Sequence, residues 1–513
     1  MNRHHFAVLV LTLLICLPVK GQDREFTVLF TNDIESVYDP ISAYWDDDID
    51  EIGGIAFLAS LIDQRREESE TSFLFDAGDI FTGSLSKVTQ GRLVFDIYSA
   101  MDYDAVNIGN HEFEYGWRVL RQVMQRARFP FLSANIFYQG TDINFAQQYT
   151  ILQKNGIRIG VIGVIGVDAF TNATMKANRL GLEVRTPAPI VQQLANQLSQ
   201  EVDMVVVLTH QNQTAPMQSN KATDKNVQRG FQEDYDLAGD VTGVHLIIGG
   251  HSDHGLWQLV EHPETGTWIG QTFGQGQYLG EAVFRLSQKG DVALVRSRLL
   301  PVDSAKLPED KAVSKLIQNA RENHPELNRV VGHLMAPAFR QYNQESNIGN
   351  LLADAIKESG GADLGMIGPG SIRTDLNQGD VTVEMLSNVF PFTDEVVVVQ
   401  VTGDTLRATL EYSLSLKYGL AQFSGLQLNY DPGAPVGQRL LELAVDGKPV
   451  KSAALYSLAT TTYNATGGDG YGMLAASEQS ALSISIADAI VQYFEKHKKV
   501  AVPELGRQVK VEP

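Results

Sequence analysis

Between Glu25 and about Leu300, short apolar runs alternate with segments of helical periodicity, and this rhythm constrains the fold more than any other feature. The helical segments include Ile55–Glu67 and Trp117–Ala127. Strands that alternate with helices are typical of α/β proteins, in which helices cover a sheet. The predicted strands are Phe26–Phe30, Ser72–Phe75, Ala105–Ile108, Arg158–Ile162, Met204–Leu208 and His245–Ile248.

Five of these strands are followed at once by side chains that commonly bind metals or transfer protons. The carboxyl ends of strands in α/β sheets line a crevice where ligands bind, so we expect these side chains to converge. A lone histidine or acidic turn would more often be structural, but five coincidences of position and type favour a site. The residues are Asp33 and Glu35 after the first strand, Asp76 and Asp79 after the second, Asn110, His111, Glu112 and Glu114 after the third, His210 after the fifth, and His251, Asp253 and His254 after the sixth.

The first of these pairs, Asp33 and Glu35, comes directly after the strand in the stretch EFTVLFTNDIES. Residues two apart on an extended chain point to the same side. The spacing therefore predicts that both carboxylates are directed at one target.

The sequence changes character near residue 330, which predicts a second domain. The segment from Pro301 to Glu309 carries two prolines and several polar residues, as a linker would, and Lys311–Glu322 has the pattern of a bridging helix. Beyond it, the helical segment Glu345–Ser359 and the short strand Glu395–Val401 indicate an α+β domain. The predicted limits are 24–300 for the first domain, 301–329 for the linker with its helix, and 330–513 for the C-terminal domain.

The amino terminus, MNRHHFAVLVLTLLICLPVKGQD, has the pattern of a secretory signal peptide. A short basic region precedes the apolar run Phe6–Leu17, which is too short for a comfortable membrane span. Val19 and Gly21 are small enough for cleavage after Gly21. An uncleaved anchor and lipidation at Cys16 are the alternatives. We expect a signal peptide at 1–21 and a periplasmic or secreted mature protein without stable membrane association.

Charge and cysteine content exclude several function classes. The formal net charge of −20 argues against nucleic acid or an anionic membrane as a standing partner. Cys16 is the only cysteine and lies in the predicted signal peptide. The mature chain would therefore have neither thiolate metal sites nor thiol catalysis.

The series TND-x-E, GD, GNHEFE, TH and GGHSD resembles the motifs of the calcineurin-like dinuclear metallophosphoesterases. It is most similar to the 5′-nucleotidase / UDP-sugar hydrolase / 2′,3′-cyclic phosphodiesterase family, and the resemblance covers nearly the whole mature chain. The resemblance implies a four-layer sandwich of two mixed sheets flanked by helices, followed by a C-terminal α+β substrate-binding domain. It also implies an exported enzyme that releases phosphate from nucleotides by attack of a metal-bridging hydroxide.

By position, the resemblance implies two divalent metal ions and a catalytic pair. Asp79 would bridge the ions, which could be Mn, Zn, Mg or Fe. The first site departs from the family because Glu35 stands where a histidine is usual, which makes it rich in carboxylates and favours Mn, Mg or Fe. A solvent-facing acid or a second-layer acid is the alternative for Glu35. The remaining assignments are Asp33, Glu35 and Asp253 for one ion, Asn110, His210 and His251 for the other, His111 as the catalytic histidine and Glu114 as the acid that orients it.

The C-terminal domain carries the implied substrate-binding residues. Arg373 would contact the phosphate, Phe392 and Tyr463 would stack on the base, and Asp469 would contact the ribose. Packing in a core is the alternative for both aromatic residues. Gly368 and Tyr342 depart from the nucleotidase pattern. They leave open a phosphodiesterase, a nucleotide-sugar hydrolase, or a hydrolase of another phosphate or sulfur ester with the same metals, and, as the remotest reading, an inactive binding protein.

Overall fold

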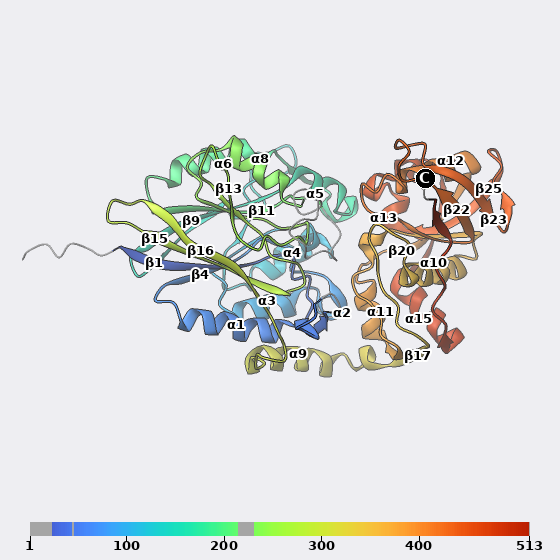
Figure 1. Cartoon of the computed structure of the whole chain (residues 1–513), viewed down its shortest axis with the longest axis horizontal. Helices are drawn as coiled ribbons and strands as arrows, with labels where there is room; N and C mark the ends of the chain where they lie inside the picture. The colour runs from blue at the N-terminus through green and yellow to red at the C-terminus, as the bar shows by residue number, and fades with distance from the viewer. Residues whose placement is uncertain (1–22, 44–45, 214–229, 512–513) are drawn as a thin grey trace, which may run out of the picture.

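The computed structural model describes residues 23–43, 46–213 and 230–511, which form two parts connected by a helix (Figure 1). The predicted signal peptide at 1–21 lies outside the described residues. Among the described helices, none combines the length and apolar character needed to cross a membrane.

The N-terminal part contains two six-stranded mixed sheets. In the first, parallel pairs join β1, β4, β5 and β6, and antiparallel pairs add β15 and β16. Its strands, in spatial order, are β16 (Val292–Pro301), β15 (Tyr278–Leu286), β1 (Arg24–Thr31), β4 (Ser72–Asp76), β5 (Ala105–Asn107) and β6 (Phe131–Leu132). The second sheet has the order β13 (Val260–Glu261), β14 (Trp268–Gly270), β12 (Leu246–Ile248), β11 (Met204–His210), β9 (Ile157–Ile165) and β8 (Tyr149–Lys154).

The central strands are buried on both faces, which explains their nearly continuous apolar sequence. Alternate residues of β1, Phe26 and Phe30 among them, pack with Val206 and Leu208 of β11 in the core between the two sheets. Leu29, on the opposite face of β1, packs in the core beneath the helices.

Helices cover the outer faces of the two sheets and complete the predicted four-layer sandwich (Figure 1). The first sheet is covered by α1 (Ile55–Glu67), α3 (Arg92–Ala100) and α9 (Lys311–Asn323), and the second by α6 (Pro187–Leu198) and α8 (Gln232–Asp240). Asp310 caps α9 by accepting a hydrogen bond from the Val313 backbone nitrogen at 2.8 Å. Val313, Ile317 and Ala320 bury one side of α9 in the N-terminal core, so the connecting helix packs on that part.

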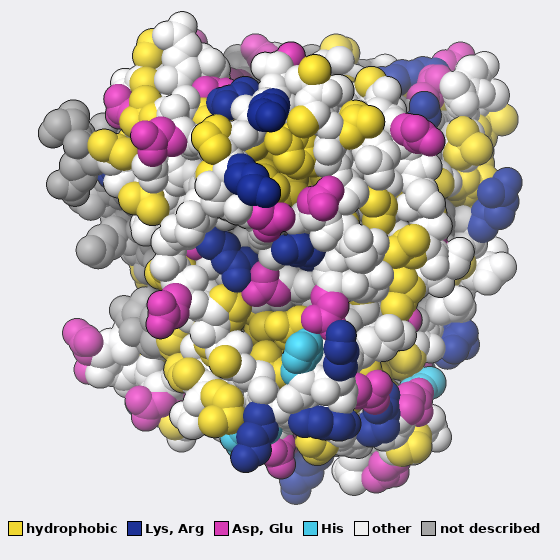
Figure 2. Space-filling view, turned by 90° about the vertical axis from the view of Figure 1, so that its right-hand side faces the viewer, with side chains coloured by type: hydrophobic (Ala, Val, Ile, Leu, Met, Phe, Trp, Pro, Cys, Tyr) yellow, Lys and Arg dark blue, Asp and Glu magenta, His cyan; other side chains and the backbone are white. Residues whose placement is uncertain are grey.

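The C-terminal part is built on a five-stranded sheet with helices on both faces. On its end face, charged side chains of both signs are interspersed among apolar ones (Figure 2). The sheet order is β21 (Gln422–Ser424), β18 (Leu364–Ile367), β25 (Leu455–Thr461), β20 (Glu395–Thr402) and β26 (Glu478–Ser485). The helices are α10 (Asn347–Gly360), α11 (Val383–Val389) and α15 (Ile486–His497) on one face and α12 (Gly403–Ser413) on the other. Two smaller sheets join β17 (Val330–Leu334), β19 (Gly379–Thr382) and β27 (Lys499–Val500), and β22 (Leu426–Tyr430), β23 (Leu440–Val445), β24 (Lys448–Pro449) and β28 (Gln508–Lys510).

Candidate metal centre and substrate pocket

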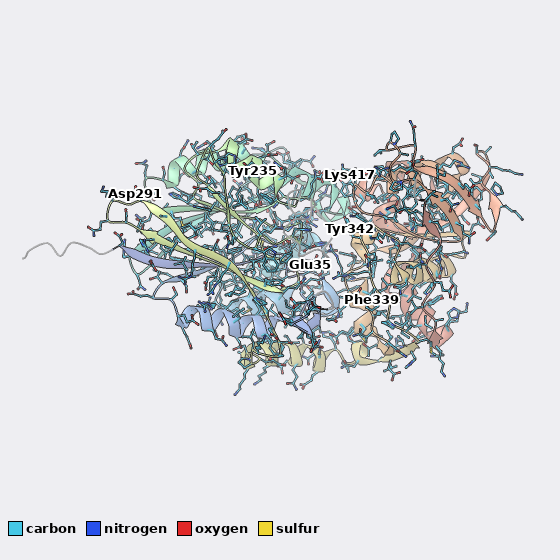
Figure 3. All side chains as sticks on the ribbon, viewed as in Figure 1. Glu35, Tyr235, Asp291, Phe339, Tyr342 and Lys417 are labelled. Carbon is cyan, nitrogen blue, oxygen red and sulfur yellow. The ribbon has the colours of Figure 1, made fainter. Side chains whose placement is uncertain are left out.

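The predicted site residues meet in one cavity between the two parts of the chain. Figure 3 shows Glu35 and Tyr342, which both line the cavity, at this junction. His210, the last residue of β11, is fully buried beneath it. The other predicted residues all line the cavity: Asp33, Glu35, Asp79, Asn110, His111, Glu114, His251 and Asp253 from the N-terminal part, and Arg373, Phe392, Tyr463 and Asp469 from the C-terminal part.

We call Asp79, Asn110, His210 and His251 the histidine cluster. Single ligand atoms of Asp79, His210 and His251 all lie within 4.8 Å of one another. His210 Nδ1 lies 3.1 Å from the Ala77 carbonyl oxygen, which can accept the Nδ1 proton and so leave the Nε2 lone pair for a metal ion. That Nε2 lies 2.9 Å from Asp79 Oδ2 and 3.1 Å from Asn110 Oδ1. The donor set is one that a divalent transition metal accepts.

We call Asp33, Glu35, Asp79 and Asp253 the carboxylate cluster, and each of them is at most 5% exposed. Burial raises the pKa of Asp33 to about 7, although nearby His210 opposes the shift. Burial, together with nearby Glu35 and Asp33, holds the pKa of Asp253 well above its usual range. Glu35 Oε2 and Asp253 Oδ1 are buried and have no hydrogen-bond partner among the described residues. Oxygen atoms in this state fit a hard divalent cation, which would neutralise them.

The backbone that carries the side chains of the two clusters is strained. Asp33, Glu35, Asp79, His251 and Asp253 have φ values of 51°, 51°, 61°, 80° and 57°, in the left-handed region that non-glycine residues rarely occupy. The expectation that Asp33 and Glu35 share one side of an extended chain is therefore wrong, because the chain turns at both residues. They reach the same cavity through this turn. Such strain persists only where the surroundings hold the chain.

Glu112 supplies part of that hold. Its carboxylate accepts hydrogen bonds from the backbone nitrogens of Asp79 (3.0 Å), Ile80 (2.7 Å), Phe81 (3.2 Å) and Gly109 (2.6 Å). These bonds tie the loop after β4 to the loop after β5. A Cβ atom at Gly109 would clash with Asp79 Oδ1, so the two loops touch directly. Sequence reasoning found Glu112 at a strand end but gave it no role.

His111 lies at the centre of the cavity. Its Nδ1 lies 2.9 Å from Glu114 Oε1 and its Nε2 lies 2.9 Å from Arg373 Nη2. Burial alone would lower the pKa of His111, but Asp79 and Glu114 outweigh it and raise the pKa to about 9. A protonated ring would repel the guanidinium, so the contact with Arg373 belongs to the neutral ring with its proton on Nδ1.

The C-terminal residues complete the cavity. Arg373 Nη1 lies 2.9 Å from Glu35 Oε1 and 4.0 Å from Asp253 Oδ2. The Phe392 ring stacks on His111 with centroids 5.6 Å apart. The Tyr463 hydroxyl donates to the Asn172 carbonyl oxygen at 2.6 Å, in α5 (Val167–Asn172), and lies 2.9 Å from Asp469 Oδ1. Phe392 and Tyr463 thus face the cavity rather than lying wholly within a core.

Comparisons with known proteins agree with this architecture. The family model of calcineurin-like phosphoesterases matches residues 26–254, and that of the 5′-nucleotidase C-terminal domain matches residues 330–476. Protein UshA of Yersinia enterocolitica is 28% identical over 533 residues, which cover 93% of this chain and 92% of UshA. The snake venom 5′-nucleotidase of Naja atra is 27% identical and covers 94% of this chain and 98% of its own.

Solved structures share the fold over nearly the whole chain. The 5′-nucleotidase precursor from Thermus thermophilus superposes with a TM-score of 0.83 at 23% identity, over 96% of this chain and 100% of that one. The sulfate thiohydrolase SoxB of Thermus thermophilus gives a TM-score of 0.79 at 19% identity, over 95% and 97%. The chain therefore belongs to the 5′-nucleotidase family, whose members are hydrolases that join a calcineurin-like phosphoesterase domain to a 5′-nucleotidase C-terminal domain.

Proposed function

We propose that the chain is an exported, metal-dependent phosphohydrolase that releases phosphate from nucleotides. One observation carries the proposal: a single cavity joins two clusters of metal-binding side chains to an arginine and aromatic rings of the C-terminal part. A phosphoryl group placed at the metal-binding end would leave its organic substituent beside the aromatic rings.

The histidine cluster and the carboxylate cluster would each hold one divalent ion, with Asp79 shared between them. Nitrogen and amide ligands suit zinc as well as Mn or Fe, whereas the carboxylate cluster favours Mn, Mg or Fe. When bound, a pair of such ions activates water as a nucleophile and neutralises phosphoryl oxygens. Glu35 enters this assignment because its Oε2 is buried without a hydrogen-bond partner in the part of the chain that the structure describes.

His111 would move the proton that the leaving group needs. Glu114 accepts the Nδ1 proton and fixes the ring, so Nε2 faces the cavity. Protonated at Nε2, His111 would donate to the oxygen of the departing alcohol. In the structure Arg373 Nη2 contacts His111 Nε2, so Arg373 would have to turn away from the histidine toward the phosphoryl oxygens. Its planar guanidinium binds such oxygens well.

The C-terminal residues would recognise the remainder of the substrate. Phe392 and Tyr463 offer aromatic faces for a base, and stacking tolerates different bases. Asp469 would accept hydrogen bonds from ribose hydroxyls. Tyr342 also lines the cavity, in the neighbourhood where the family places a second phosphate-binding arginine, so Arg373 would be the one arginine matched to the phosphate.

The proposal of export rests on residues 1–21, whose basic start, apolar run and small residues before position 22 are those of a signal peptide. The mature protein would act in the periplasm or outside the cell.

The test is phosphate release by the metal-stripped mature chain after addition of Mn²⁺, Zn²⁺, Mg²⁺ or Co²⁺ singly. The substrates are AMP, ATP, UDP-glucose, 2′,3′-cyclic AMP and a small aryl phosphate. We expect metal-dependent turnover of AMP well above that of the aryl ester. Turnover of the aryl ester alone would retain the metal centre and refute the nucleotide pocket. No turnover with any metal would refute the proposal as a whole.

A further inference from the structure

Asp234 is a buried carboxylate that lies outside the cavity, in the first turn of α8. It accepts hydrogen bonds from three residues on either side of His210. Thr209 Oγ1 donates to Oδ1 at 2.6 Å, Gln211 Nε2 donates to Oδ1 at 2.9 Å, and Asn212 Nδ2 donates to Oδ2 at 2.5 Å. The Asp234 side chain thus binds the side chains of three residues that flank His210 in the sequence.

The contacts continue from Asp234 to the loop that carries His251. Asn212 Nδ2 also donates to Gln271 Oε1 at 2.8 Å, Gln271 Nε2 donates to Ser252 Oγ, and Ser252 Oγ donates to the Gly230 carbonyl oxygen at 2.6 Å. We call Asp234, Asn212, Gln271 and Ser252 the relay. It runs beneath the carboxyl ends of three adjacent strands, β11, β12 and β14, and each of its side chains is fully buried.

The direction of every bond in the relay follows from Asp234. An ionised carboxylate accepts hydrogen bonds and cannot donate them. Asn212 must therefore direct its NH₂ group toward Asp234, and the same NH₂ group donates to the side-chain oxygen of Gln271. The NH₂ group of Gln271 then donates to Ser252. The Asp234 backbone nitrogen, which donates to Asn212 Oδ1 at 3.2 Å, holds the same orientation.

The relay also touches the backbone before His251. A Cβ atom at Gly249 would clash with Asp234 Oδ2 and would lie 2.7 Å from Asn212 Nδ2. The end of β12 therefore rests directly on the carboxylate, and His251 follows two residues later. His251 itself has a φ of 80°, a conformation that needs such support.

We propose that Asp234 is a positioning residue that holds both histidines of the histidine cluster in register for metal binding. The inference rests on the proposed metal-binding role of His210 and His251. The relay would then contribute to the metal affinity of the chain as well as to its stability. Partners behind metal ligands typically account for about ten- to hundredfold in metal affinity.

Asp234→Asn tests the polarity of the relay while preserving its volume. The new NH₂ group must face either Asn212, which donates, or Thr209 and Gln211, where the Thr209 hydroxyl would have to accept and could donate only to the distant Ile248 carbonyl oxygen at 3.5 Å. A flip of Asn212 would turn its own NH₂ group toward the Asp234 backbone nitrogen, which also donates. Each rearrangement leaves a buried polar group without a partner, which is unfavourable.

The measurement is calorimetric titration of the chelator-treated mature chain with Mn²⁺ or Zn²⁺ alone, paired with thermal unfolding. We expect Asp234→Asn to bind the tighter ion about ten- to hundredfold more weakly. The matched control is Glu281→Gln. Glu281 is 1% exposed, and its carboxylate accepts hydrogen bonds from Arg65 and Arg298 at 2.7 and 3.0 Å. It lies in β15, in the sheet that does not carry the relay. This variant should lower the melting temperature and leave metal affinity unchanged.

Exchanging the two partners should restore binding. In Asp234→Asn/Asn212→Asp, Thr209 and Gln211 donate to the new amide oxygen, and the new NH₂ group donates to the carboxylate at 212. Gln271 and Ser252 can reverse their bonds to match. We expect the double variant to recover most of the lost affinity, which a loss of stability alone would not explain.

The outcomes separate this inference from the proposed function. A wild-type chain that binds no ion refutes the metal centre itself. A wild-type chain that binds while Asp234→Asn binds equally well, or loses only melting temperature as Glu281→Gln does, refutes the role of Asp234. If Asp234→Asn does not fold, Ser252→Ala removes only the last hydroxyl of the relay. It should weaken binding about fivefold, the effect of one hydrogen bond, and unchanged affinity there also refutes the inference.

Discussion

The two clusters of the metal centre are supported in different ways. In the histidine cluster, the Ala77 carbonyl orients His210, and the His111 backbone nitrogen donates a hydrogen bond to Asp79 Oδ1 at 2.8 Å. In the carboxylate cluster, one oxygen of Glu35 and one of Asp253 have no hydrogen-bond partner within residues 23–43, 46–213 and 230–511. Arg373 reaches Glu35 from the C-terminal part of the chain.

The side chains of the histidine cluster are thus held ready for an ion, whereas those of the carboxylate cluster depend on other groups. A ligand set held in place needs little reordering when its ion arrives, so more of the contact energy appears as affinity. We therefore expect the histidine cluster to hold the tighter ion. The carboxylate cluster should hold a weaker one, because Arg373 places positive charge beside Glu35 and competes with the ion.

Asp79→Ala should have the largest effect because Asp79 belongs to both clusters. We expect both ions to be lost and phosphate release to fall on the order of 10³-fold or more, since bound ions supply several kcal/mol of transition-state stabilisation. Metal analysis of the purified variant, together with its rate on AMP, measures this. Retention of one ion per chain would show that the clusters do not share Asp79.

His210→Ala and Asp253→Ala form a pair that separates the clusters. His210→Ala should weaken the tighter ion by more than about 100-fold, beyond what loss of a supporting residue costs. Asp253→Ala should leave that ion in place and remove the weaker one. Calorimetric titration of both variants with Mn²⁺ reports the two affinities. Equal losses of both ions in both variants would contradict the division into clusters.

Glu35 can be tested by two replacements. Glu35→Ala should weaken the second ion about ten- to hundredfold while the first stays bound. Glu35→His restores a metal ligand but cannot accept a hydrogen bond from Arg373 at the same time, so it should recover metal binding and not the contact with the C-terminal part. Unchanged metal content in Glu35→Ala would make Glu35 a supporting acid only.

Arg373→Met should have the smallest effect on the metals and act mainly on substrate. Loss of a charge-assisted hydrogen bond of about 1.5–3 kcal/mol should raise the KM for AMP about 10- to 100-fold. The weaker ion should bind slightly more tightly, because a neighbouring positive charge is gone. The control is Arg507→Met, whose arginine joins Asp354 at 2.8 Å within the C-terminal part and does not line the cavity. It should change neither KM nor metal affinity.

The fold could be predicted well from the sequence because its signals are local. Periodicity located the helix Ile55–Glu67 with the bounds that α1 has, and the other predicted elements end within a few residues of the observed ones. The strand Met204–Leu208 continues to His210, since polar residues at a strand end still pair with β9. The rule that sites form beyond strand ends predicts the convergence of most of these side chains in one cavity, but Asp76 and His254 do not line it, and Asp76 bonds Thr31 and Tyr98 instead.

The supporting contacts could not be predicted, because they depend on three-dimensional proximity. Glu112 binds backbone groups of another loop, and Asp234 lies in a helix whose sequence, QEDYDLAGD, looks like an ordinary acidic helix start. Arg373 and Glu35 belong to different parts of the chain and contact each other only where these parts pack together. Glu112 stands inside a recognised motif, and that was the one signal available for it.

The most direct test is titration of the chelator-treated mature chain with Mn²⁺, with metal analysis of the product. We predict two ions per chain that bind in two resolved steps, the tighter abolished by His210→Ala and the weaker by Asp253→Ala. One ion per chain, or two ions that bind with the same affinity and disappear together in either variant, would contradict this prediction.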